Sequence, residues 1–133
     1  HSSDPHFAPS KNNSKVIKRG DFILIDLWCK KNVPHAVYGD ITRVAVAGSK
    51  PSKRHQEIFD IVKEAQNKAL LFVKERYEHG HLLFGFEVDR ICRQVIEDAG
   101  YGESFLHRTG HNIDEEDHRP GAHIDDLETH DTR

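Results

Sequence analysis

Two aspartates in strand-like sequence are the first residues of this chain whose types suit chemistry. Asp26 lies inside the short apolar run Phe22–Trp28, and Asp40 opens a second alternating run that ends at Ala47. The first run is typical of a strand that is buried on at least one face. Because an ionised carboxylate in such surroundings is costly unless a cation or hydrogen-bond donors compensate it, Asp26 requires a partner.

A hairpin would bring the two carboxylates together. Folding the chain about Val33, within the polar turn Lys30–Pro34, predicts that Asp26 and Asp40 face each other at directly paired positions, about 4.5–5.5 Å apart. Opposed carboxylates repel each other unless one holds a proton or divalent metal ions lie between them. The alternative, which the pattern leaves open, is that one aspartate caps the turn or pairs with Arg43.

Histidine, with eleven copies, is the compositional outlier. His107 and His111 lie four residues apart around Gly110, in a segment that lacks an apolar stripe, so we expect no helix there and separate roles for the two rings. Imidazole together with carboxylates suits zinc, manganese, iron or cobalt better than calcium. Other histidines are expected to lie on the surface or to make ordinary hydrogen bonds, namely His55, His79, His81, His123 and His130.

Composition excludes several classes of protein. Of the 133 residues 36% are hydrophobic and 31% charged, and the net charge of −3 with interspersed signs gives no support for binding nucleic acid or membranes. No apolar run approaches the length of a membrane span, and the first residues do not resemble a signal peptide. Cys29 and Cys92 are too few for a disulfide framework or a cysteine zinc site, so we expect a reducing, cytoplasmic location.

Helices are expected to follow the two strands. One is predicted from about Lys53 to Tyr77, with Ser52 as its N-cap, and another from about Glu87 to Ala99. Gly80 and Gly100 are the expected helix stops. The residues expected to face inward are Ile58, Val62, Ala65, Ala69 and Phe72 or Val73 in the first helix, and Val88, Ile91, Cys92, Val95 and Ile96 in the second.

Three regions of the chain are distinguished by these patterns. Residues 1–19 are expected to form an extended lead-in, with a short strand around His6–Phe7. Residues 101–133 form a histidine-rich segment that would supply the active site. By length the whole of 1–133 is one domain.

Four motifs, taken in order, resemble those of the M24 "pita-bread" metallopeptidases. They are Gly20–Asp26, Tyr38–Arg43, His107–His111 and His118. Within this family the chain is most similar to Xaa-Pro aminopeptidases and prolidases, over nearly its whole length. The resemblance implies an α+β, partial pita-bread fold, in which a curved antiparallel sheet carries the two helices on its outer face.

The resemblance also implies residue roles. Three side chains would ligate metal: Asp26, Asp40 and His111. Three histidines would be catalytic, binding the substrate and stabilising the tetrahedral intermediate: His6, His107 and His118. The centre would hold two divalent ions, Mn²⁺ first and Co²⁺, Zn²⁺ or Fe²⁺ as alternatives, and a bridging hydroxide would attack the scissile carbonyl.

The implied reaction is hydrolysis of N-terminal Xaa-Pro bonds in peptides with proline at the second position. The family carries two further glutamate ligands on later strands, and Glu115, Glu116 and Glu128 lack that context, so we expect an internal fragment that is inactive by itself. Exposed strand edges predict a homo-oligomer. Methionine aminopeptidase is a nearby variant of the same chemistry. The alternatives are a non-catalytic pita-bread module that binds peptides or proteins, and a creatinase-like hydrolase.

Overall fold

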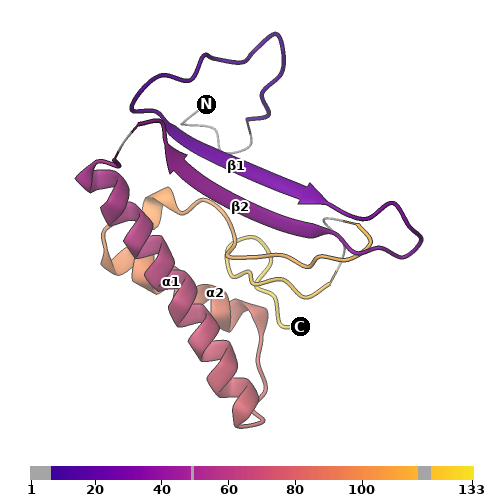
Figure 1. Cartoon of the computed structure of the whole chain (residues 1–133). Helices are drawn as coiled ribbons and strands as arrows, with labels where there is room; N and C mark the ends of the chain where they lie inside the picture. The colour runs from indigo at the N-terminus through magenta and orange to yellow at the C-terminus, as the bar shows by residue number, and fades with distance from the viewer. Residues whose placement is uncertain (1–6, 49, 117–120) are drawn as a thin grey trace.

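The computed structural model of the chain describes residues 7–48, 50–116 and 121–133. Strands β1 (Phe22–Cys29) and β2 (Gly39–Val46) precede helices α1 (Lys53–Glu78) and α2 (Gly85–Asp98), and the short 3₁₀ helix η1 (Gly102–Ser104) follows. The expected α+β composition is therefore confirmed. In Figure 1 the hairpin lies on one side, the helix pair on the other, and the C-terminal segment runs between them.

The hairpin register differs from the predicted one. Asp26 pairs with Thr42, and Asp40 pairs with Trp28, so the prediction that the two aspartates are directly paired is wrong. The hairpin is centred on Pro34 rather than on Val33, and moving the centre by one residue shifts the pairing by two. Because side chains alternate with a period of two, both carboxylates still project from the same face of the sheet.

Both faces of the hairpin are open, which contradicts the expected burial of β1. Leu24, Ile25, Leu27 and Trp28 are each about half exposed. In the described part of the chain the helices pack against each other and not on the sheet, contrary to the arrangement that the resemblance implies. The physical reason is that the irregular C-terminal segment lies between the hairpin and the helices (Figure 1).

The helix boundaries follow the sequence signals closely. The Ser52 hydroxyl accepts a hydrogen bond from the amide of His55, at 3.2 Å, and the His55 ring accepts one from the amide of Ser52, which confirms the predicted N-cap. Gly80 and Gly100 have φ of +65° and +83° directly after the two helices. Glycine adopts this left-handed conformation without a steric penalty, so both predicted stops are confirmed.

The core is small and lies between the helices. Its five buried residues are Ala65 and Ala69 of α1 and Val88, Cys92 and Ile96 of α2, all of them predicted to face inward. Ile58 and Val62 were also expected inside but are 38% and 52% exposed. α1 has 26 residues and α2 only 14, so the first turns of α1 extend beyond the partner helix.

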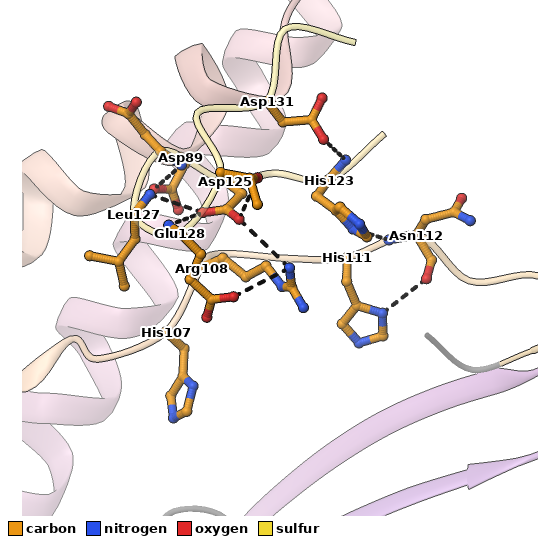
Figure 2. Close-up of polar contacts among 12 residues, drawn as sticks. Asp89, His107, Arg108, His111, Asn112, His123, Asp125, Leu127, Glu128 and Asp131 are labelled. Atoms are coloured by element: carbon orange, nitrogen blue, oxygen red, sulfur yellow. Dashed lines mark hydrogen bonds and ion pairs between the residues drawn. The ribbon is translucent and has the colours of Figure 1, made fainter. Parts of the chain in front are cut away.

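Asp125 organises the last part of the chain from a fully buried position. Its carboxylate accepts hydrogen bonds from the amides of Leu127 and Glu128, both at 2.9 Å, and from the Thr129 hydroxyl at 2.8 Å. The guanidinium of Arg108 lies 3.6 Å away, and Figure 2 shows these groups converging on one carboxylate. An acidic side chain thus satisfies the backbone of a segment that has no helix or strand partner.

A second buried carboxylate joins this segment to the start of α2. Asp131 accepts from the amide of His123 at 3.0 Å, and its own carbonyl accepts from the amide of Phe86 at 3.0 Å. Gly85 makes this approach possible, because a Cβ placed there would lie 1.7 Å from the carbonyl oxygen of His123.

We expect Gly85→Ala to destabilise the chain by about 1–3 kcal/mol or more, since the added methyl group overlaps the His123 carbonyl. The measurement is the free energy of unfolding from urea denaturation. Gly39→Ala is the matched control, because the nearest atom to its added Cβ would be 3.9 Å away. Equal stability of the two variants would contradict the close packing described here.

Acid should weaken the C-terminal segment. Burial alone would raise the pKa of Asp125, but the hydrogen bonds from Glu128, Thr129 and Leu127 and the charge of Arg108 outweigh it and hold that pKa below its usual value of 3.8. Hydrogen bonds from His130 and Arg90 likewise lower the pKa of Asp126. A carboxyl with a depressed pKa stabilises the folded state above its unfolded pKa and loses that contribution as the pH falls through its folded pKa.

The free energy of unfolding should therefore be level just above pH 4 and fall steadily below the unfolded pKa of 3.8. Asp125→Asn should reduce this acid dependence and lower stability at pH 7. Asp98→Asn is the control, because Asp98 is exposed and its carboxylate accepts a hydrogen bond from the side chain of Gln94, one turn away. An unchanged acid slope in Asp125→Asn would show that the carboxyl has no such role.

Candidate active site

Asp40 and His111 meet although 71 positions separate them in the chain. The Nε2 atom of His111 lies 3.3 Å from Oδ2 of Asp40, and the two side chains are 21% and 22% exposed. One residue comes from the start of β2 and the other from the C-terminal segment. Two of the predicted metal ligands are thus brought together at a partly sheltered position.

Polar contacts at the hairpin loop create this meeting. The amide of Tyr38 donates to the carbonyl of Asp114 at 3.0 Å, and the ammonium of Lys30 donates to the carbonyl of Glu115 at 2.5 Å. The ring of His35 lies 2.8 Å from the Glu115 carboxylate. These contacts hold the loop end of the hairpin against the residues that follow His111.

A short bridge shapes the histidine segment itself. Gly110 and Ile124 exchange two backbone hydrogen bonds of 3.1 Å, and the amide of Asn112 donates to Nδ1 of His123 at 3.0 Å. The segment is extended and not helical, as expected. His123 therefore makes the ordinary hydrogen bond that the sequence predicted for it, and so does His130, which contacts Asp126.

The hydrogen bonds of His111 fix its tautomer. Nδ1 lies 3.0 Å from the carbonyl oxygen of Asn112, which can only accept, so Nδ1 carries the ring proton. In the neutral ring Nε2 then presents a lone pair to the carboxylate of Asp40. Two electron-rich atoms at this separation repel each other unless a proton or a metal cation lies between them.

The distance between the two atoms also fits a shared metal ion. Nitrogen and oxygen ligands that lie about 2.0–2.2 Å from one ion are separated by about 3.0–3.4 Å at angles between square and tetrahedral. The observed 3.3 Å falls in this range. The donor set, one imidazole with one carboxylate, is that of zinc, manganese, iron or cobalt sites.

Asp26 lies on the same sheet face but does not join this pair. Its carboxylate is exposed and accepts a hydrogen bond of 2.5 Å from the hydroxyl of Thr42, its cross-strand partner. Arg43 lies on the opposite face and donates to the carbonyl of Thr42, so it is not the partner of Asp26. Among the described residues no group of three or more histidine, cysteine or acidic side chains could hold a metal ion.

The remaining predicted residues are placed unevenly. In Figure 2 the side chains of His107 and His111 project from the same side of their segment, while Arg108 reaches toward Asp125 and Glu128. His6 and His118 lie outside the described residues.

Sequence reasoning missed a buried ion pair on α2 that touches this segment. Asp89 is fully buried, and Nε of Arg93 donates to it at 2.5 Å. The available signal was a carboxylate and a guanidinium at positions i and i+4, each directly beside a residue of the apolar stripe, Val88 and Cys92.

No helix within the described ranges is long and apolar enough to cross a membrane.

Known proteins resemble this chain strongly. It is 38% identical over 114 residues to the Xaa-Pro dipeptidase of Pyrococcus furiosus, covering 86% of this chain and 29% of that protein. The Xaa-Pro dipeptidase of Pyrococcus horikoshii is 39% identical over 118 residues, with 86% and 29% coverage. Among solved structures, the X-Pro aminopeptidase of Thermotoga maritima aligns with a TM-score of 0.68 and 34% identity, covering 90% of this chain and 31% of that one.

The chain spans less than a third of the length of these relatives. The sequence profile of metallopeptidase family M24 matches it over residues 1–133. The match covers both strands, both helices and the Asp40–His111 pair. The chain belongs to metallopeptidase family M24.

Proposed function

We propose that this chain is part of a metal-dependent peptidase that hydrolyses N-terminal Xaa-Pro bonds in peptides with proline at the second position. The observation that carries the proposal is the contact between Nε2 of His111 and the Asp40 carboxylate. At 3.3 Å these two atoms repel each other unless a proton or a metal cation lies between them. The substrate class is supported by the names of the relatives, an Xaa-Pro dipeptidase and an X-Pro aminopeptidase.

Asp40 and His111 would be the first two ligands of the metal centre, and Asp26 would complete the part of it that this chain supplies. Asp26 suits this role because its carboxylate is exposed on the same sheet face as Asp40. We propose two divalent ions, Mn²⁺ first and Co²⁺, Zn²⁺ or Fe²⁺ as alternatives. When bound, such ions polarise a carbonyl and lower the pKa of water.

The histidines would act on the substrate. We propose that the imidazole of His107, which projects from the same side of its segment as His111, faces the oxygen that gains charge as the peptide bond is attacked (Figure 2). We propose His6 and His118 for the same group of substrate-binding side chains. Asp40 and His111 themselves would be reserved for the metal.

A second candidate is a pita-bread module that binds peptides without cleaving them. It is favoured by the finding that the described residues bring only two, and not three, of the predicted ligands together. A creatinase-like hydrolase would share the scaffold and differ in accepting creatine. Turnover of an Xaa-Pro dipeptide, an Xaa-Ala dipeptide and creatine by the full-length protein separates these functions.

Mn²⁺ titration by calorimetry tests the metal centre in the 133-residue chain. Asp40→Asn and His111→Ala should each weaken binding by at least about tenfold, because each removes a direct ligand. His81→Ala is the control, since His81 lies just past the end of α1, where its ring stacks on that of His79 with centroids 5.8 Å apart. Absence of stoichiometric binding in the unsubstituted chain would contradict the proposal.

We also propose that the chain self-associates through the open hairpin. Its exposed apolar residues include Leu24 and Leu27, on opposite faces of β1. Light scattering should show a mass above that of a monomer, and Leu27→Lys should lower it. A clean monomer at tens of micromolar would contradict this. The two cysteines form no disulfide, in keeping with the proposed cytoplasmic location.

A further inference from the structure

The buried pair Asp89–Arg93 on α2 has no role in the site described so far. Asp89 is 0% exposed and the Arg93 side chain 14% exposed. A buried ion pair contributes little net stability by itself, because removing two charges from water offsets their attraction. The other contacts of this pair therefore indicate what it does.

Three of these further contacts are made with the backbone on either side of His107. Nη1 of Arg93 donates to the carbonyl of Phe105 at 3.1 Å, and Nη2 donates to the carbonyl of His107. Oδ1 of Asp89 accepts from the amide of Thr109 at 2.8 Å. The pair thus holds alternate residues 105, 107 and 109, on both sides of the His107 side chain.

The same pair also holds the stretch of backbone that faces this segment across the Gly110–Ile124 bridge. Oδ2 of Asp89 accepts from the amide of Asp126 at 3.0 Å, directly after the bridge between Gly110 and Ile124. The Arg93 guanidinium additionally lies over the Phe105 ring, 4.3 Å from its centroid. One side-chain pair on a helix therefore holds the backbone on both sides of the bridge that precedes His111.

We infer that Asp89 and Arg93 are positioning residues, which hold the backbone of His107 and His111 in register with Asp40. The expected effect on metal binding rests on the proposed function, whereas the contacts of Asp89 and Arg93 with the backbone do not depend on it. Neither residue touches the reacting groups. Their effect passes through the main chain, because a displacement of Thr109 would carry His111 away from the carboxylate that it faces at 3.3 Å.

Arg93→Lys is the sharpest test, because lysine keeps the charge but carries all its donors on one nitrogen, which cannot replace the three separate nitrogens that Arg93 directs at one carboxylate and two backbone carbonyls. Arg90→Lys is the matched control. Arg90 lies one turn away on the same helix and also pairs with an aspartate, Asp126, at 2.5 Å. Unlike Arg93, it donates no hydrogen bond to the backbone of residues 105–111 in the described structure. Asp89→Asn is the second variant, and it removes the negative charge without changing shape.

Three quantities should be measured in the 133-residue chain at a temperature where circular dichroism shows each variant to be folded. They are amide hydrogen exchange at Thr109, the ¹⁵N signals of the His111 ring and the Kd for Mn²⁺. Arg93→Lys and Asp89→Asn should speed amide exchange at Thr109. They should also weaken Mn²⁺ binding by about tenfold, which is the smaller of the losses that follow when a group that orients a metal ligand is replaced. Exchange within α1 should not change.

Arg90→Lys should leave all three quantities unchanged. The inference is overturned if Arg93→Lys, while folded, leaves exchange at Thr109 and the His111 ring signals as they were, or if it changes only the melting temperature. Should the unsubstituted chain bind no Mn²⁺, the proposed function fails. Exchange and ring signals would then still decide whether the pair positions the segment.

Discussion

The structure depends on how the polar backbone of an irregular segment is satisfied without a helix or a sheet. The described residues between Phe105 and Asp131 form one isolated bridge, and several of their amides donate to side-chain carboxylates instead of to a helix or sheet partner. Three buried carboxylates accept these hydrogen bonds, Asp89, Asp125 and Asp131. The acidic residues of this region therefore hold the backbone in place, and the histidines of the candidate site lie on that backbone.

This arrangement explains why much of the site could not be predicted from sequence. Apolar periodicity predicted α1 and α2 to within two residues, and five of the positions that it placed inside form the core, whereas Ile91 does not belong to it. The pattern carries no information about a carboxylate that binds distant amides. Asp125 lies in a segment rich in acids, and Asp89 lies next to Arg90 on α2, so apolar periodicity marks neither carboxylate as buried, although both are fully buried.

The hairpin shows a second limit of sequence reasoning. Alternation identified both strands and placed both aspartates on one face, because a period of two survives any even shift of register. It could not fix the shift itself, which depends on whether the turn is centred on Val33 or Pro34. The Asp40–His111 contact was implied by family resemblance, and its geometry is set by contacts such as that between Tyr38 and Asp114, which no local pattern indicates.

The position of Asp40 relative to His111 is set by few interactions, and this has a thermodynamic consequence. The hairpin touches α1 at the start of β1, where the rings of Phe22 and His55 lie 5.8 Å apart. Contacts at Tyr38, Lys30 and His35 tie its loop to the histidine segment. A cation shared by Asp40 and His111 would add a tie of the same kind between the same two parts. Part of the free energy of metal binding would then stabilise the position of the hairpin relative to the histidine segment. The reason is that a ligand that binds only the assembled arrangement stabilises that arrangement.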